Sequence, residues 1–320
     1  MIRQAQHERE RGEAGTNLAV LIPFGIVTLI WGSTWLVIRD QIAVVPGLWS
    51  VAYRFALAGG AMAVLAIARR ERFPNDAAGL GFAAGLGVAQ FTLNYSFVYA
   101  AEAHITSGLV AVVFALLLLP NALLGRLVLG QRLSARLLAG SGVAMAGVAL
   151  LILQQARSDP SGPHETVLGV ALTGAAILAA SCANVAQGTA VAKRYPMTAM
   201  LACAMLIGAA VDAAVAWLTV GPPVLPPTAR YLAGVAYLAL AGSALAFSLY
   251  YRVLRVIGAA RAAYASVLVP VIAMLLSTLF EGYRWSALAV AGAVLTGVGL
   301  VVALSAPSAA VAARRRRPTR

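Results

Sequence analysis

The chain consists mainly of long apolar stretches separated by short polar segments. Ten of these stretches are long enough to cross the ~30 Å hydrocarbon core of a bilayer as helices, at ~1.5 Å per residue. They are too long and too uniformly apolar to be the strands of a membrane barrel. The predicted helices cover residues 18–38, 47–68, 79–101, 105–128, 134–153, 167–192, 197–218, 230–250, 260–280 and 285–304.

The pattern repeats at an offset of 150 residues. Prolines and glycines return in the same register: Pro46 and Pro196, Gly108 and Gly258, Pro120 and Pro270, Gly142 and Gly292, Gly147 and Gly297. These residue types mark unusual backbone, so the shared register indicates a duplicated five-helix unit. We expect an all-α membrane protein with one copy in residues 18–153 and the other in residues 167–304. Residues 154–166 would form an outer linker, and residues 1–17 and 305–320 cytoplasmic tails.

Composition places the chain in a membrane. Hydrophobic residues make up 61% and charged residues 11% of the chain, with a mean hydropathy of +0.85, whereas a soluble domain is nearer a quarter charged. The first apolar stretch is too long for a cleaved signal peptide and ends in Arg39 and Asp40, so we expect it to be retained. Cys182 and Cys203 both fall within predicted helices, where a packing role is expected.

The distribution of basic residues predicts the orientation. With the N-terminus inside, 19 of the 24 Lys and Arg residues fall on the inner side and four on the outer side. The positive-inside rule then predicts a protein of the plasma or inner membrane with both termini cytoplasmic. Five helices per copy is an odd number, so the copies would be inverted, which is the geometric basis of alternating access. The net charge of +13 is explained by topology and anionic lipid rather than by nucleic acid.

Several short motifs carry a family resemblance. Trp31-Gly32-Ser33, Arg54-Phe55 and the segment from Pro120 to Gly130-Gln131 resemble the first half of an EamA-type transporter. The segments Leu268-Val269-Pro270 and Leu279-Phe280-Glu281 resemble its second half. The resemblance implies the ten-helix branch of the drug/metabolite transporter superfamily, in which export of amino acids and related metabolites is common.

The two copies differ from one another at one acidic position. Where such repeats commonly carry Glu after Leu-Gly, this chain has Gln131, whereas the second copy keeps Glu281. Only one copy could therefore use the acid, and whether Glu281 has a role that Gln131 has lost is left open.

Two charged residues fall within predicted helices at similar depths. A charge at the bilayer centre costs roughly 2.5–3.5 kcal/mol on insertion scales, so Arg54 and Asp212 should face protein or water. Asp212 is a candidate coupling-ion site for a proton or another cation, and Arg54 a candidate anchor for a substrate carboxylate. The alternatives are structural contacts between helices, or a pair formed by Arg54 and Asp212.

Aromatic and amide side chains supply further substrate-binding candidates. Trp31 and Trp35 are spaced i, i+4 and share one helix face, which suits either a cavity wall or an interfacial aromatic belt. Amide side chains form two more stripes, one of Gln90 and Asn94 and one of Asn184 and Gln187. Such stripes suit either substrate recognition or contacts between membrane helices. The complete set of substrate-binding candidates is Trp31, Trp35, Arg54, Gln90, Asn94, Tyr95, Asn184 and Gln187.

Prolines, glycines and one outer turn complete the candidates. Pro120 and Pro270 each remove a helix hydrogen bond, which makes them hinge candidates or simply residues accommodated by packing. Gly142 and Gly147, with Gly292 and Gly297, mark expected close helix contacts. Glu102 and His104 fall in a short outer turn, for which we expect a solvated loop.

The leading hypothesis is a secondary transporter, most plausibly an exporter, of a small organic metabolite such as an amino acid, with proton coupling at Asp212 as a further hypothesis. The three histidines lie outside the predicted helices, and no P-loop is present. We therefore expect no enzymatic activity, metal, cofactor or nucleic-acid partner. The alternatives are a flippase for lipids or lipid-linked head groups and a non-transporting membrane scaffold. Substrate, coupling ion, direction and oligomeric state are left open.

Overall fold

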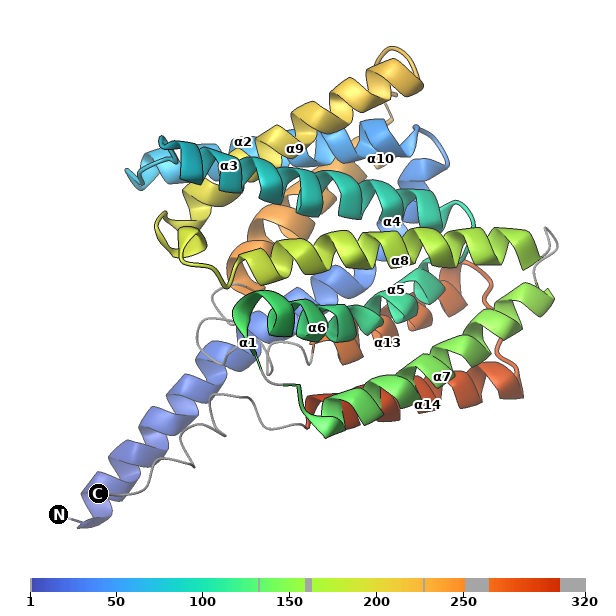
Figure 1. Cartoon of the computed structure of the whole chain (residues 1–320), viewed down its shortest axis with the longest axis horizontal. Coiled ribbons are helices and arrows are strands. Elements are labelled where there is room, and N and C mark those ends of the chain that lie inside the picture. The colour runs from blue at the N-terminus through green and yellow to red at the C-terminus, as the bar shows by residue number, and fades with distance from the viewer. Residues whose placement is uncertain (1, 132, 159–162, 227, 251–264, 306–320) are drawn as a thin grey trace.

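The computed structural model describes residues 2–131, 133–158, 163–226, 228–250 and 265–305. Every regular element in these ranges is helical, and the helices form a layered bundle (Figure 1). The α-helices are α1 (Ile2–Ile42), α2 (Gly47–Ala68), α3 (Ala77–Leu86), α4 (Asn94–Glu102), α5 (Ser107–Phe114), α6 (Leu118–Leu129), α7 (Ala135–Ser158), α8 (Pro163–Ala186), α9 (Met197–Thr219), α10 (Ala229–Ala236), α13 (Ala265–Phe280) and α14 (Ala287–Leu304). The π-helices are η1 (Gly87–Leu93) and η4 (Tyr237–Leu245), and the 3-10 turns are η2 (Ala115–Leu117) and η3 (Val191–Lys193).

Seven segments in the described residues are long and apolar enough to span a membrane: Ile22–Ile42, Gly47–Ala68, Ser107–Leu129, Ala135–Arg157, Pro163–Ala186, Met197–Thr219 and Ala229–Tyr250. Two shorter apolar helices cover Leu268–Phe280 and Ala287–Ala303. The helical, multi-pass character of the chain is thus confirmed. Ten crossings and the inverted relation of the copies stay predictions. The predicted 79–101 helix is not among the seven segments, the last two helices are shorter, and residues 251–264, which hold Gly258 and the start of the predicted 260–280 helix, lie outside the described residues.

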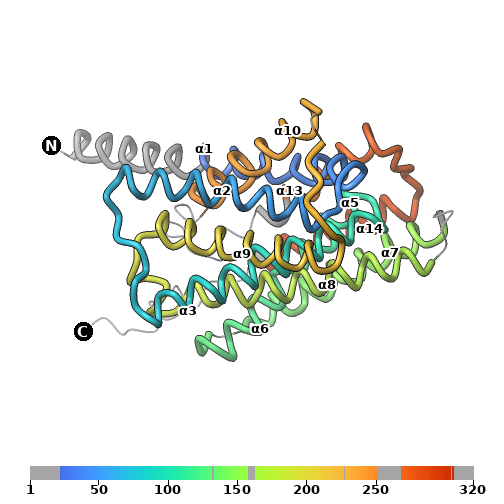
Figure 2. The backbone as a smooth tube through the Cα atoms, turned by 90° about the horizontal axis from the view of Figure 1, so that it is seen from above, coloured from blue at the N-terminus to red at the C-terminus, as the bar shows by residue number. Residues whose placement is uncertain are grey.

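Corresponding elements of the two copies start in the predicted register. Pro46 and Pro196 directly precede α2 and α9, with nearly equal backbone angles (φ −51°, ψ 131° and φ −56°, ψ 139°). Proline suits this place because its fixed φ leads into the helix and its missing N–H is not needed there. The two helices pack along each other, and Figure 2 shows α9 between α2 and α3.

The two π-helices also start 150 residues apart, at Gly87 in η1 and Tyr237 in η4. A π turn is rare and often lies at a functional site. η1 joins α3 to α4, so the predicted 79–101 helix is a continuous rod with a wider turn in its middle. The glycine at the start of η1 also permits a close crossing, since a methyl group on Gly87 would lie 2.6 Å from the carbonyl oxygen of Ala204 in α9.

Glycines hold α7 and α14 side by side at one edge of the bundle (Figure 1). A methyl group on Gly147 would lie 2.6 Å from the carbonyl oxygen of Gly292, and one on Gly292 would lie 2.8 Å from that of Gly147. Gly142 and Gly297 were expected in the same contact, but a methyl group on either would meet nothing within 4 Å. Gly140 and Gly299 take that place instead, because they lie on the faces of the two helices that meet.

The predicted hinge prolines lie in different local structure. Pro120 is the third residue of α6, directly after the 3-10 turn η2 that interrupts this span. Pro270 lies inside α13, which continues on both sides of it. A hinge role for either residue stays a prediction.

Candidate functional site

A cavity of about 140 Å³ lies in the middle of the bundle, between α1, α4, α8, α13 and the segment after η4. Six of its 18 described lining residues are aromatic, and η1, α4 and α8 each contribute an amide. The lining includes the predicted residues Trp31, Trp35, Gln90, Asn94, Tyr95, Asn184 and Pro270, together with Phe114, Phe247 and Tyr250, which the sequence analysis did not single out. No charged side chain is among the described residues that line it.

Three polar atoms of the cavity wall lack a hydrogen-bond partner within the described part of the chain. They are the indole Nε1 of Trp35, Oε1 of Gln90 and Oδ1 of Asn94. Gln90 and Asn94 are 5% and 3% exposed. The side-chain amide nitrogen of Asn94 donates to the backbone carbonyl oxygen of Gln90 at 3.3 Å. A buried polar atom without a partner costs free energy. The wall is therefore suited to a ligand that brings both donors and acceptors.

Trp31 joins the two copies at the edge of the cavity. Its indole N–H donates to the carbonyl oxygen of Gly242 in η4 at 3.1 Å, and its ring lies 5.0 Å from Tyr250 and 5.5 Å from Phe247, centroid to centroid. Trp35, one turn on, packs its ring against Phe114 at 5.7 Å. Both tryptophans thus face the interior, as a cavity wall requires and an interfacial belt does not.

Arg54 lies one layer behind the cavity wall. Its guanidinium carbon is 4.4 Å from the Tyr95 ring centroid, and its Nε donates to Ser243 Oγ in η4 at 3.0 Å. The side chain is 1% exposed, and Nη1 has no hydrogen-bond partner among the described residues. Since Tyr95 separates Arg54 from the cavity, the geometry favours a contact between helices over a direct carboxylate anchor.

Asp212 on α9 is also fully buried and does not line the cavity. Its Oδ1 accepts from Ser96 Oγ of α4 at 3.1 Å, while Oδ2 has no partner within the ranges that the structure describes. No ion pair joins Arg54 and Asp212, both of which are described residues. Gln187, predicted to share a polar stripe with Asn184, lies outside the cavity lining.

The family model of the EamA-like transporters matches this chain twice, over residues 20–153 and 167–305. The chain belongs to the EamA-like transporter family. This EamA-like chain is 21% identical to Protein PagO of Salmonella typhimurium over 302 residues, which cover 94% of this chain and 97% of that protein. It is 28% identical to the Uncharacterized inner membrane transporter YedA of Escherichia coli over 272 residues, 82% of this chain and 84% of YedA.

One further relative and one solved structure extend the comparison. Over 160 residues, half of each chain, the EamA-like chain is 28% identical to a Probable amino-acid metabolite efflux pump of Escherichia coli. One known crystal structure superposes with a TM-score of 0.63 at 23% identity, covering 90% of this chain and 97% of the other; this likeness concerns the fold alone. The family identifies the chain as a membrane transporter, and its apolar helices make it multi-pass.

The predicted outer turn of this EamA-like chain is not a solvated loop. The Glu102 side chain is completely buried, and neither carboxylate oxygen has a hydrogen-bond partner in the described chain. His104 is partly buried and hydrogen-bonds to Glu165 at the start of α8. The expectation was wrong for Glu102 because α4 runs one residue further than predicted, which carries the carboxyl under the neighbouring helices.

The acid that only the second copy retains joins the two copies at the end of α13. Glu281, directly after α13, accepts from Ser107 Oγ at 2.7 Å and from the Ser107 N–H at 3.4 Å, at the first turn of α5. Gln131 is exposed, and a methyl group on Gly125 would lie 2.8 Å from its Oε1. The position that corresponds to Ser107 in the second copy, residue 257, lies outside the described residues.

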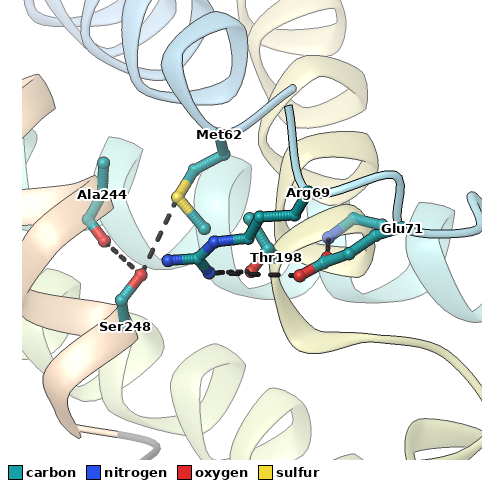
Figure 3. Close-up of polar contacts among 7 residues, drawn as sticks. Met62, Arg69, Glu71, Thr198, Ala244 and Ser248 are labelled. Atoms are coloured by element: carbon teal, nitrogen blue, oxygen red, sulfur yellow. Dashed lines mark hydrogen bonds and ion pairs between the residues drawn. The ribbon is translucent and has the colours of Figure 1, made fainter. Parts of the chain in front are cut away.

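A second cavity, of about 550 Å³, lies between α2, the start of α9 and η4. Its polar residues come from both copies (Figure 3): Arg69 Nη1 donates to Thr198 Oγ1 at 3.3 Å and lies 4.0 Å from Glu71, while Ser248 Oγ donates to the Ala244 carbonyl at 2.7 Å. Leucines that are partly exposed on the outside of the bundle complete the lining: Leu65, Leu240 and Leu245. The cavity therefore combines a cationic group with an apolar, membrane-facing wall.

One signal in the sequence pointed to the missed aromatic residues. Phe247 and Tyr250 are spaced i, i+3 and follow the segment 237–245, which repeats the position of residues 87–95 with Gln90 and Asn94. Applying the 150-residue register to the polar stripe would have drawn attention to this segment. Phe114 carried no such signal, because its run is uniformly apolar.

Proposed function

We propose that this chain is a secondary transporter that exports a small organic metabolite, an amino acid or a related amine, through the central cavity. The observation that carries the proposal is the combination of aromatic faces with the free oxygens of Gln90 and Asn94. An ammonium group can donate to these oxygens and lie over the faces of Trp31 or Tyr95. The Trp35 indole N–H can donate to a carboxylate or carbonyl of the same molecule.

The size and charge of the cavity support a small polar ligand. A volume of about 140 Å³ is roughly ten times the ~10–15 Å³ that a cavity needs to hold one water, which leaves room for a small molecule. With no charged lining among the described residues, a zwitterion would be held by dipoles and ring faces. Alternating access between inverted repeats, with both termini cytoplasmic, would move such a ligand across the inner membrane. We keep Asp212 as the hypothetical coupling site, because it is buried with one oxygen unpartnered.

The second cavity supports one competing function. A flippase for lipids or lipid-linked head groups needs a lateral opening and a basic group near the membrane surface. The cavity between α2 and η4 offers Arg69 for a phosphate and partly exposed leucines for acyl chains. Glu71 lies next to Arg69 and weakens its attraction for an anion, so the metabolite carrier is preferred.

The deciding experiment is thermal unfolding of the purified protein in detergent, with amino acids, nucleobases, quaternary amines and lipid head groups added singly. A ligand at 100 times its Kd adds ~2.7 kcal/mol to stability, which shifts the melting temperature measurably. Asn94→Leu should abolish the shift, whereas Gln187→Leu, an amide outside the cavity lining, should keep it. Counterflow of the stabilising compound in proteoliposomes then tests transport.

The possible outcomes separate the two functions. Stabilisation by one small metabolite that depends on Asn94 supports the carrier. Stabilisation by lipid head groups alone, abolished by Arg69→Ala and not by Asn94→Leu, would replace the carrier with the flippase. A non-transporting scaffold is indicated if no compound in the panel changes the melting temperature.

A further inference from the structure

Glu102 is a buried acid that the proposed substrate cavity does not use. It is the last residue of α4, its side chain is 0% exposed, and both carboxylate oxygens lack a hydrogen-bond partner in the described chain. Burying an ionised carboxylate without partners is far more costly than burying the neutral acid. An alanine or leucine at the end of α4 would avoid this cost. The presence of a carboxyl group at this position is therefore best explained by a ligand that binds to it.

The charged groups around Glu102 and along α4 come from five elements. The Glu281 carboxylate after α13 repels a second negative charge at this place, whereas Arg39 of α1 and Arg54 of α2 attract one. Two other acids face α4: Glu165 of α8 bonds to His104, and Asp212 of α9 accepts from Ser96 through Oδ1 alone. On α4 itself, the Tyr99 hydroxyl donates to Gln41 at 3.1 Å. No described group donates a hydrogen bond to Glu102.

The surroundings also provide a route by which the carboxyl can be exposed. Glu281 bonds to Ser107, which follows Glu102 by five residues, and this contact fastens the outer end of α13 to the start of α5. The buried hydroxyl oxygens of Thr106, Ser277 and Tyr283 line the same junction and have no partner among the residues described. Opening of the junction would bring water to these hydroxyls and to Glu102 together.

We propose that Glu102 is a proton-binding site of the transporter, loaded in the conformation described above and emptied when the outer ends of α5 and α13 separate. On emptying, the carboxyl O–H bond breaks, the proton passes to water on the outer side, and the resulting carboxylate is hydrated and faces Arg39. This proposal rests on the proposed transport function and adds a second acid to Asp212.

The first test is chemical labelling of the full-length protein in lipid nanodiscs with dicyclohexylcarbodiimide, a small apolar reagent that adds to protonated carboxyl groups. Mass spectrometry of the digest should show an adduct at Glu102 at pH 6, with a yield that falls as the pH is raised. Glu165→Gln, which alters a paired and partly exposed acid nearby, should leave that yield unchanged. The proposal is overturned if the Glu102 peptide is recovered unmodified at pH 5 while the Asp212 peptide is labelled.

The second test is thermodynamic and uses the conservative variant. A carboxyl that keeps its proton when folded and loses it when unfolded makes stability fall with rising pH, by up to tenfold in the folded-to-unfolded ratio per pH unit. Between pH 6 and 8, wild type should lose stability relative to Glu102→Gln and Glu102→Leu, which lack this proton. Equal pH dependence of all three proteins would contradict the proposal.

A comparison of sodium with choline tests whether Glu102 binds a proton or a metal cation. Melting temperatures of wild type and Glu102→Gln are compared in sodium and choline chloride at equal ionic strength. We expect no difference between the salts; stabilisation by sodium that requires Glu102 would assign the site to that cation instead. All three readouts work without a substrate, so their failure is distinct from failure of the metabolite panel.

Discussion

The indole N–H of Trp31 on α1 donates to the carbonyl oxygen of Gly242 in η4, 3.1 Å away. The acceptor belongs to a π-helix, whose widened turn leaves carbonyl groups available to partners outside the helix. Arg54, which like Trp31 belongs to the first copy, donates a hydrogen bond to Ser243, the next residue of η4. The π-helix of the second copy is thus hydrogen-bonded to both Trp31 and Arg54 of the first copy.

Trp31→Phe removes this hydrogen bond and keeps an aromatic ring. We expect a loss of about 0.5–1.5 kcal/mol in the free energy of unfolding, the usual net value of one hydrogen bond. Thermal denaturation in detergent without ligand measures it. An unchanged melting temperature would mean that the Trp31 contact with η4 contributes nothing to holding the two copies together.

Trp35→Phe is the matched variant at the other tryptophan. The Trp35 indole N–H has no partner among the described residues, so the substitution removes ring contacts but no hydrogen bond and should destabilise the ligand-free protein less than Trp31→Phe does. If a ligand accepts from this N–H, its Kd should rise about tenfold, since 1.4 kcal/mol corresponds to a factor of ten. Isothermal titration with the stabilising compound checks this. An unchanged Kd would place the ligand away from Trp35.

Gly147→Ala should be strongly destabilising. The added methyl group would lie 2.6 Å from the Gly292 carbonyl oxygen, so α7 and α14 must move apart, at a cost typical of overpacking, about 1–3 kcal/mol. Gly142→Ala is the control, because its methyl group meets nothing within 4 Å. That variant should stabilise the helix by up to ~1 kcal/mol. Opposite shifts in the two melting curves are expected; equal shifts would contradict the contact.

These glycines illustrate what the sequence could and could not predict. The 150-residue register placed the helices, their start after Pro46 and Pro196, and a glycine contact between the last helices of the copies. It could not choose between Gly142 and Gly140 as contact residues, because the face that meets a partner depends on the rotation of each helix. Only Gly147 and Gly292 were assigned correctly.

The candidate site, too, was predicted only in part from the sequence. Aromatic and amide stripes at i, i+4 spacing predicted Trp31, Trp35, Gln90 and Asn94, which do converge on one cavity. Arg54 was selected for its charge, yet it lies behind Tyr95, where a ring face and the Ser243 hydroxyl contact the guanidinium and Nη1 has no partner among the described residues. Glu102 was misjudged because a shift of one residue at a helix end separates a solvated turn from a buried helix terminus.

Asp76, at the N-terminus of α3, provides a pH-dependent test outside the membrane spans. The Gly79 N–H, which donates to its carboxylate at 2.5 Å, lowers the pKa of Asp76 below its usual value, and Tyr195 and Arg194 act in the same direction. A lowered pKa in the folded state contributes stability above the unfolded pKa of ~3.9 and loses it as the pH falls through the folded value. The advantage of wild type over Asp76→Asn should therefore vanish on acidification. Melting curves from pH 6 to 3 measure it, and a constant difference would contradict the contact.

Glu281→Ala tests whether the acid that one copy retains is a structural fastener. It removes both hydrogen bonds to Ser107, and hydrogen bonds to charged groups are worth about 1.5–3 kcal/mol, so we expect a loss in that range. The corresponding substitution in the other copy, Gln131→Ala, affects an exposed side chain and should change stability by less than ~0.5 kcal/mol. Both are measured by thermal denaturation.

The asymmetry between these two variants bears on the transport cycle. If Glu281 fastens α13 to α5 only while the outer side is closed, Glu281→Ala should also open that side more often. The test introduces Ser286→Cys or Val44→Cys into a background without Cys182 and Cys203. Either cysteine should then react faster with a membrane-impermeant maleimide in Glu281→Ala than in Gln131→Ala. Reactivity equal to that of Gln131→Ala, together with lost stability, would make the contact structural and uninvolved in opening. In that case the junction around Glu102 must be opened by another element, and the Asp40–Arg230 ion pair between α1 and α10 is the next contact to remove.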